Sequence, residues 1–198
     1  MAILKTHEIT LSNTEFGNII LKPLSDKYLP HLYKWNSDPD FLYWCEEDEI
    51  SCRNEDDVNS IYGNISQNAF CFVIEIDGVI IGECWLQEMN IIDVVEKYPQ
   101  KNIKRIDIAI GEKKYLGKGI GTKVINLLVD FAFLQNNVDI IYCFICSYNI
   151  RSLKAFEKNG FIYVNSREIK DNPKSKMELH YILTKEEYLK NIKDNKKE

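Results

Sequence analysis

The stretch Ile106-Asp107-Ile108-Ala109-Ile110 and the nearby stretch Tyr115-Leu116-Gly117-Lys118-Gly119-Ile120-Gly121-Thr122 decide the fold of this chain. In the first stretch, isoleucine at every second position predicts a strand whose two faces differ. After the glycines, apolar residues recur at helical spacing from Ile120 to Leu134, which predicts a helix with one buried face. The sequence therefore predicts a strand, a glycine loop and a helix in succession.

The glycine loop is predicted to bind phosphate groups. The first backbone N–H groups of a helix have no intrahelical acceptor, and together with the helix dipole they attract anions. Glycine also lets a pyrophosphate approach the backbone closely. The alternative is an ordinary strand-to-helix turn that binds nothing.

Two common nucleotide motifs are excluded by their spacing. A dinucleotide fingerprint G-x-G-x-x-G that began at Gly117 or Gly119 would need glycine at position 122 or 124, where Thr122 and Val124 stand. A P-loop that ended at residues 117–118 would need glycine at position 112, which is a glutamate. Neither motif describes this loop.

Instead, the loop resembles the coenzyme A signature of the Gcn5-related N-acetyltransferases (GNAT), [QR]-x-x-G-x-[GA]. Gly119 and Gly121 fill its two small positions, and Leu116 stands where the general pattern has Gln or Arg. Residues 149–161, N-I-R-S-L-K-A-F-E-K-N-G-F, resemble the N-x-x-[AS]-x-x-x-[YF]-x-K-x-G-F ending of the same superfamily. The resemblance implies an α/β (α+β) fold with a mixed, mostly antiparallel sheet of about seven strands flanked by helices.

The resemblance also implies that acetyl-CoA is the co-substrate, held in a slot between two strands that splay apart. No metal is expected. Asn149 additionally fits the N-cap of the helix that follows it. The residues that the resemblance assigns to the cofactor are Ile108, Ile110, Leu116, Gly117, Lys118, Gly119, Ile120, Gly121, Thr122 and Asn149.

The N-terminal third is similar to the aminoglycoside 6'-N-acetyltransferases. Residues 32–35 (L-Y-K-W) and 41–48 (F-L-Y-W-C-E-E-D) match their L-Y-x-W segment and their aromatic pair before acidic residues. These enzymes also carry L-G-K-G-[LI]-G-T-K in the loop, which agrees with Leu116, and an aspartate ten residues before the first loop glycine, as Asp107 precedes Gly117. Over about residues 19–184, the resemblance implies acetyl transfer to the 6'-amine of an aminoglycoside.

Asp107 is the candidate catalytic residue. An alkylamine with a pKa of about 10.4 is almost entirely ammonium at neutral pH, so something must accept its proton before it attacks. We expect Asp107 to hold the ammonium and accept that proton directly or through water, while N–H groups near Ile108 stabilise the oxyanion. The alternative is a structural ion pair of Asp107 with Arg105 or Lys104.

Three further residues are assigned to the polycationic acceptor besides Asp107. Trp44, with the acidic residues 46–48, is expected to form an aromatic and anionic wall; the alternative for Trp44 is a place in the core. Asp93 and Glu96 lie in an acidic stretch between predicted strands, and the alternative for them is a solvated loop.

The group that protonates the departing thiol is left open. Many GNAT members have a tyrosine where this chain has Phe156, so Tyr148, Tyr115 or water would take that role. Coenzyme A thiolate is already a fair leaving group, because the reference pKa of a thiol is about 8.5.

Composition agrees with one enzyme domain over residues 1–198, with a core at about 19–184 and a charged tail at 185–198. With 198 residues and 45% hydrophobic content the chain can bury a full core. The formal net charge of -5 favours a cationic substrate and disfavours nucleic acid. No apolar run reaches the length of a membrane span, so a cytoplasmic protein without membrane contact is expected. The oligomeric state, monomer or homodimer, stays open.

The cysteines predict neither disulfides nor a metal site. Cys71, Cys84, Cys143 and Cys146 fall in predicted strands among apolar residues, where a thiol packs as a small hydrophobe. The odd offset between Cys143 and Cys146 places their side chains on opposite faces of a strand.

The predicted strands are 19–24, 70–76, 79–88, 104–110, 139–146, 161–168 and 176–184. Strands 70–76 and 79–88 are expected to form a hairpin around Asp77-Gly78, a strong turn signal. The predicted helices are 25–35 (capped by Ser25 or Asp26), 55–66, 119–135, 150–159 and a short one from Lys185.

Two alternative functions stay open. One is a GNAT enzyme that acetylates a protein N-terminus or a polyamine, which would show a more open groove and fewer acidic residues between 83 and 107. The other is an acyl-CoA-binding domain without catalysis, suggested by Leu116 and Phe156.

Overall fold

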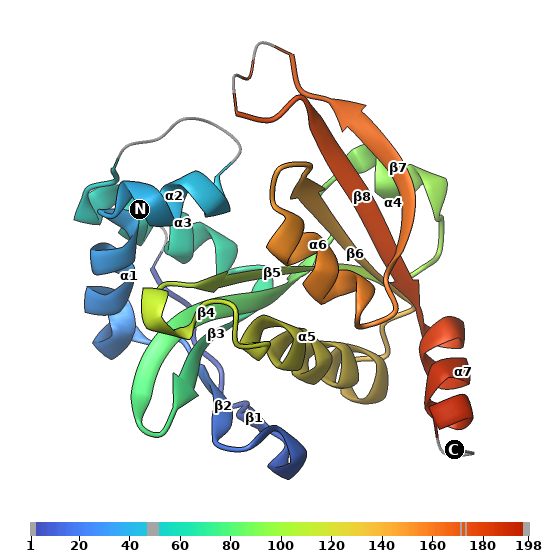
Figure 1. The fold of residues 1–198 in the computed structure, drawn as a ribbon, viewed down its shortest axis with the longest axis horizontal. Coiled ribbons are helices and arrows are strands. Elements are labelled where there is room, and N and C mark those ends of the chain that lie inside the picture. Colours follow the sequence, from blue (N-terminus) through green and yellow to red (C-terminus); the bar gives the residue numbers. More distant parts are fainter. Residues whose placement is uncertain (1–2, 47–51, 171, 173, 196–198) are drawn as a thin grey trace.

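The computed structural model describes residues 3–46, 52–170, 172 and 174–195. These residues form an eight-stranded sheet in the order β1-β2-β3-β4-β5-β6-β8-β7 (Figure 1). Every neighbouring pair is antiparallel except β5 and β6, which are parallel. The mixed, mostly antiparallel sheet is confirmed, and the extra strand is the two-residue β1. The strands are β1 (Leu11–Ser12), β2 (Ile19–Pro23), β3 (Ala69–Ile76), β4 (Val79–Glu88), β5 (Ile103–Ile110), β6 (Ile140–Cys146), β7 (Ile162–Glu168) and β8 (Met177–Thr184).

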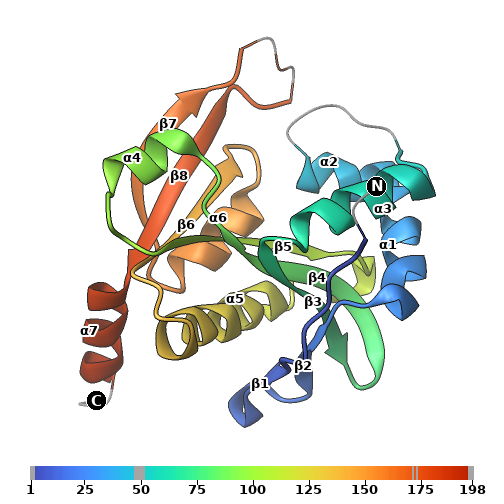
Figure 2. The same cartoon turned by 180° about the vertical axis from the view of Figure 1, so that it is seen from behind.

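Helices cover both faces of the sheet (Figures 1 and 2). One face packs against α1 (Leu29–Asn36), α2 (Pro39–Cys45), α3 (Glu55–Ile65) and α4 (Ile92–Lys97), and the other against α5 (Ile120–Asp130) and α6 (Ile150–Glu157). The remaining helical segments are α7 (Lys185–Asn195), the 3-10 turns η1 (Thr14–Phe16), η2 (Asp26–Tyr28) and η3 (Lys113–Tyr115), and the π-helical turn η4 (Phe131–Gln135) after α5.

The predicted hairpin of β3 and β4 turns at Asp77 and Gly78. Both residues have positive φ, 51° and 80°, as a two-residue hairpin turn requires. The hairpin places β4 beside β5 with Trp85 opposite Asp107 and Glu83 opposite Ala109. Directly opposed residues share a face of the sheet, so these four side chains lie on the side of α1, α2 and α3.

The functionally important feature of the sheet is the separation of β5 from β6. The two strands pair only between residues 103–105 and 140–142, and after Arg105 and Tyr142 the ladder ends. The edge of β5 from Ile106 to Ile110 that faces β6 therefore has no strand partner. This gap is the splayed slot expected for acetyl-CoA.

The helix predicted after the glycine loop is α5, which packs on the face of the sheet opposite α1, α2 and α3. Val124, Ile125 and Leu128 of α5 are fully buried in one cluster with Ile106 of β5 and Cys84 of β4. Because side chains alternate along a strand, packing Ile106 toward α5 directs Asp107 to the opposite face. The same alternation that builds the core thus orients the candidate catalytic residue.

The N-terminal helix begins later than predicted. Residues 26–28 form the turn η2, and α1 starts at Leu29 with Pro30 in its first turn, where the missing N–H is tolerated. Ser25 makes no side-chain cap hydrogen bond, and Asp26 belongs to the turn, so the predicted capping is wrong.

Two helices were absent from the prediction. Asp38 caps α2 by accepting from the Asp40 N–H, and Pro39 opens the helix. The stretch around Asp93, predicted as an irregular connection, forms α4. The predicted C-terminal helix is present, and Tyr188 fixes it by donating a 2.7 Å hydrogen bond to Asp130.

Three further observations concern membrane spans, metal ligands and the cysteines. Among the helices of the described residues, none combines the length and apolar character that crossing a bilayer requires. The same part of the chain holds no group of three His, Cys, Asp or Glu side chains placed to bind a metal ion. Cys71, Cys84, Cys143 and Cys146 lie in strands β3, β4 and β6, as expected.

Candidate active site

The glycine loop joins β5 to α5 in a conformation that glycine favours. Gly117 and Gly119 both have φ of +74°, a region in which an L side chain is strained. The first bond of α5 runs from the Lys123 N–H to the Gly119 carbonyl, at 3.3 Å. The amides before Lys123 in the first turn of α5 are therefore placed to donate to an anion.

A cavity of about 720 Å³ extends from this loop along the slot. Its apolar wall includes Ile108, Ile110 and Ile125, and its rim carries the cations Arg151 and Lys154. An apolar channel that ends at a helix N-terminus and basic side chains fits the arm and phosphates of coenzyme A. All the residues assigned to the cofactor from sequence line this cavity except Lys118.

Asn149 connects this cavity to α2. Its Oδ1 accepts from the Ser152 N–H at 3.2 Å, which confirms it as the N-cap of α6. Its Nδ2 donates to the Trp44 carbonyl at 3.2 Å, and the neighbouring Tyr148 hydroxyl donates to the Tyr43 carbonyl at 2.7 Å. These bonds hold the end of α2 across the opening between β5 and α6.

Trp44 lies in the wall of the site rather than in the core. It is 38% exposed and lines both this cavity and a second one. The Arg151 guanidinium sits 4.3 Å from the centre of its ring, a cation–π distance.

The second cavity, of about 410 Å³, lies over β4 and β5 on the side of α3 and is named here the acceptor cavity. It borders on the first cavity, and seven residues line both: Phe41, Trp44, Cys45, Ile108, Ala109, Asn149 and Ser152. On β5, Asp107 lines only the acceptor cavity, and Ile110 lines only the first. The two cavities therefore meet at Ile108 and Ala109, just beyond the point where β5 leaves β6.

Asp107 lies in the acceptor cavity and is held by two donors. Its Oδ2 accepts from Arg105 Nε at 2.9 Å and from Trp85 Nε1 at 2.8 Å, and its Oδ1 accepts from Arg105 Nη2 at 3.0 Å. The ion pair considered as the alternative for Asp107 is thus present. Because each carboxylate oxygen can accept more than one hydrogen bond, the pair leaves Asp107 able to contact a further donor.

A second carboxyl group, Glu83, is buried in the wall of the acceptor cavity. It is 3% exposed, and its Oε1 accepts a 2.5 Å hydrogen bond from the Tyr62 hydroxyl. Burial, opposed in part by the Tyr62 hydrogen bond, raises the pKa of Glu83 to about 8. At neutral pH this carboxyl group is therefore mostly protonated.

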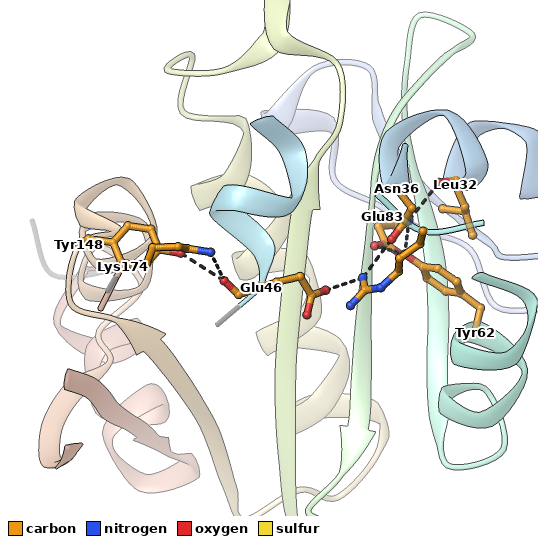
Figure 3. Close-up of polar contacts among 8 residues, drawn as sticks. Leu32, Asn36, Glu46, Tyr62, Glu83, Tyr148 and Lys174 are labelled. Atoms are coloured by element: carbon orange, nitrogen blue, oxygen red, sulfur yellow. Dashed lines mark hydrogen bonds and ion pairs between the residues drawn. The ribbon is translucent and has the colours of Figure 1, made fainter. Parts of the chain in front are cut away.

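Polar contacts extend from Glu83 toward the far wall of the cavity (Figure 3). Asn36 donates to the Leu32 carbonyl at 3.0 Å and lies 3.5 Å from the Tyr62 hydroxyl. Arg53 donates to Asn36 Oδ1 at 3.1 Å and to Glu46 Oε1 at 2.7 Å. Figure 3 shows Glu46 between this group and Tyr148, whose hydroxyl lies 3.3 Å from the Glu46 carbonyl.

The candidates for protonating the thiol lie in different places. Tyr148 lines the acceptor cavity, but its hydroxyl already donates to the Tyr43 carbonyl, and burial raises its pKa. Tyr115 lines the first cavity beside the glycine loop. Phe156, buried in α6, borders the acceptor cavity and offers no proton.

The remaining predicted acceptor residues are not brought to the site. Asp93 and Glu96 lie on α4 and line neither cavity. That helix packs through Val94 on a separate cluster formed by β5, β6 and β8. Residues 47 and 48, expected in the anionic wall, lie outside the described part of the chain.

Sequence reasoning missed Glu83 and its partner Tyr62. The signal was present: Glu83 stands in the apolar run V-I-I-G-E-C-W of residues 79–85, where alternation places it on a buried face. A carboxyl group in such a strand is rare unless paired or functional. Tyr62, from a helix distant in sequence, could not be linked to it without the fold.

Residues 18–162 match the family described as Acetyltransferase (GNAT) domain. The chain is 22% identical over 165 residues to aminoglycoside N(6')-acetyltransferase type 1 of Klebsiella pneumoniae, covering 81% of each sequence. The structure of spermidine N-acetyltransferase from Vibrio cholerae in complex with CoA and spermine has a TM-score of 0.71 at 20% identity, covering 87% of this chain and 98% of that chain. Aminoglycoside acetyltransferase AAC(6')-Ib in complex with coenzyme A and kanamycin has a TM-score of 0.68 at 19% identity, with the same coverage of 87% and 98%.

The family match spans well over half of the chain and agrees with the geometry of the first cavity. The glycine loop, the free edge of β5 and the basic rim together fit acetyl-CoA as co-substrate. The chain therefore belongs to the GNAT acetyltransferase family, whose members transfer an acetyl group from acetyl-CoA to an amine.

Proposed function

We propose that this protein is an aminoglycoside 6'-N-acetyltransferase that acts in the cytoplasm and confers resistance to these antibiotics. The observation that carries the proposal is the junction of the two cavities at Ile108 and Ala109, with Asp107 directly on the acceptor side. An acetyl group delivered along β5 and an amine held beside Asp107 would meet there.

Transfer is direct, within a ternary complex. Asp107 holds the acceptor ammonium and takes its proton directly or through water, and the free amine then attacks the acetyl carbonyl. N–H groups on the unpaired edge of β5 near Ile108 stabilise the oxygen that gains charge. The cysteines need no role, since no acyl-enzyme forms.

The lining of the acceptor cavity supports a cationic sugar-like substrate. Trp44, Trp85 and Phe144 present aromatic surface, and Glu46, Glu83 and Asp107 present carboxyl groups. Aromatic faces suit the apolar faces of an aminocyclitol, and carboxyl groups suit its amines. The likeness to aminoglycoside N(6')-acetyltransferase type 1 and to the kanamycin-bound structure supports the same substrate class.

One observation favours a polyamine as the second candidate acceptor. Glu46 and Asp107 are each paired with an arginine, so the cavity carries less net negative charge than its carboxyl groups alone would give. Such a cavity suits an acceptor with fewer amines than an aminoglycoside. The fold is also shared with spermidine N-acetyltransferase. A polyamine would require fewer simultaneous carboxylate contacts than an aminoglycoside.

An acetylation assay distinguishes these candidates. Coenzyme A release is measured with kanamycin, spermidine and a ribosomal N-terminal peptide as acceptors, and mass analysis locates the acetyl group on kanamycin. Acetylation of kanamycin at the 6'-amine is expected. Turnover of spermidine or the peptide alone would contradict the proposal, and hydrolysis without any amine acceptor would contradict both candidates.

A further inference from the structure

The acceptor cavity contains one carboxyl oxygen that no described residue satisfies. Glu83 Oε2 is completely buried and has no hydrogen-bond partner in the described part of the chain. An unsatisfied buried polar atom destabilises the folded chain, and more so when it is charged, so such atoms are rare unless a ligand or water satisfies them.

Charge pairing singles out the same group. Glu46 pairs with Arg53 at 2.7 Å, and Asp107 pairs with Arg105 at 2.9 Å. Among the carboxyl groups that line the acceptor cavity, Glu83 alone lacks a cationic partner within the described residues. Once Glu83 ionises, the cavity is therefore one cation short of balanced pairing.

Glu83 also lies nearer than Asp107 to the place where the cavities meet. Its partner on β5 is Ala109, which lines both cavities, whereas Asp107 is two residues further from the glycine loop and lines only one. The small side chain of Ala109 leaves room above the sheet at this position. A group bound to Glu83 would thus stand beside the end of the acetyl-CoA slot.

We propose that Glu83 Oε2 binds the amine that receives the acetyl group and accepts its proton in place of Asp107, which stays paired with Arg105 and holds the same ammonium. The cation completes the hydrogen bonding of the buried carboxyl group, and Tyr62 fixes its other oxygen. This inference rests on the proposed acetylation of an amine, but it does not require that the amine belong to an aminoglycoside.

The protons balance through one turnover. The neutral carboxyl group of Glu83 releases a proton to solvent when the ammonium binds, and the resulting carboxylate takes one proton from that ammonium. The free amine attacks, the C–N bond forms and the C–S bond breaks, and the second nitrogen proton goes to the departing sulfur. The products are the amide, the thiol and a neutral Glu83, with one proton released overall.

Several groups surround Glu83 and set its ionisation. Tyr62 of α3 and Arg53 favour the carboxylate, whereas Asp107 of β5 and Glu46 at the end of α2 disfavour it, as burial does. The neighbouring thiols are those of Cys45, Cys71 and Cys84. A bound ammonium adds a positive charge to this set, which is why its binding ionises Glu83.

The direct test observes the carboxyl group itself. The full chain is labelled with ¹³C at the glutamate side-chain carboxyl carbon, and Glu83→Gln identifies the Glu83 resonance. At pH 7 that resonance is expected to move to its ionised position when propylammonium, spermidine or kanamycin is added. No movement with any of the three amines overturns the inference.

Kinetics provide an independent test. For whichever amine is acetylated, Glu83→Gln is expected to reduce kcat/KM about 100-fold or more, the scale of a positioned acid or base, while coenzyme A affinity stays within about twofold. Glu88→Gln is the matched control, because Glu88 lies on the same strand, lines neither cavity and has a side chain 57% exposed. Unchanged kcat/KM in Glu83→Gln would overturn the inference and leave the proposed function standing.

Tyr62→Phe distinguishes a role of Glu83 in proton transfer from a purely structural role. The Tyr62 hydrogen bond lowers the pKa of Glu83, so its removal is expected to shift the acidic limb of the kcat/KM profile to higher pH. A residue that only supported the fold would lower activity without moving that limb.

The proposed function and this inference can fail separately. If spermidine is acetylated and kanamycin is not, the proposed function fails, while the Glu83 variants still test this inference on spermidine.

Discussion

The buried Glu83 makes the stability of this protein depend on pH in a direction opposite to that of a salt-bridged carboxylate. Burial raises the pKa of Glu83 from 4.5 to about 8 in the folded chain. Between these values the folded chain keeps a proton that the unfolded chain has released. The free energy of unfolding therefore falls as pH rises from about 4.5 to about 8, and the effect is constant outside that window.

The magnitude follows from the same values. One pKa unit corresponds to about 1.4 kcal/mol, so full ionisation of Glu83 costs the folded state about 5 kcal/mol. Glu83→Gln removes this cost but keeps the size of the side chain. Relative to Glu83→Gln, the wild type is expected to lose about 4 kcal/mol of unfolding free energy between pH 5 and pH 9.

Urea denaturation of both proteins at a series of pH values measures this difference. Other titrating groups cancel in the comparison, because the two proteins share them. Glu88→Gln serves again as the control: because it keeps Glu83, its unfolding free energy should fall between pH 5 and pH 9 as that of the wild type does. A wild-type curve that stays within about 1 kcal/mol of a constant offset from Glu83→Gln would refute the assignment of a neutral, buried carboxyl group.

Three further outcomes are expected. Asp107→Asn should reduce turnover by about 100-fold or more with coenzyme A affinity nearly intact, as measured by steady-state kinetics and calorimetry; near-normal turnover contradicts the catalytic role. Gly119→Val should weaken coenzyme A binding about tenfold or more, whereas Gly78→Val, strained at a similar φ in a distant turn, should lower stability without affecting that binding. Asn149→Ala should lower the free energy of unfolding by about 1 kcal/mol through loss of the α6 cap, and equal denaturation midpoints would argue against it.

Much of the fold could be predicted because its signals are local. The alternation of β5, the helical spacing of α5 and the Asp77-Gly78 turn each fall within a short stretch, and all are present. The misplaced start of α1 and the missing α2 have the opposite cause. Short helices opened by proline have too little periodicity to be distinguished from loops.

The cofactor side of the candidate site could be predicted from sequence, whereas the acceptor side could be predicted only in part. Residues of the glycine loop line the first cavity because loop and helix start are continuous in sequence. Asp93 and Glu96 were expected at the acceptor, but α4 places them away from both cavities. Acidic residues that precede a strand in sequence need not reach the site that the strand carries.

By itself, the sequence determined the strand, loop and helix that hold the cofactor, since backbone conformation and hydrophobic period are set by neighbouring residues. Only the tertiary structure decided which side chains face the acceptor. It paired Asp107 with Arg105 and Trp85, and it buried Glu83 against Tyr62 without a cation. The ionisation of a carboxyl group depends on burial and on charges brought from distant segments, and those are properties of the folded chain alone.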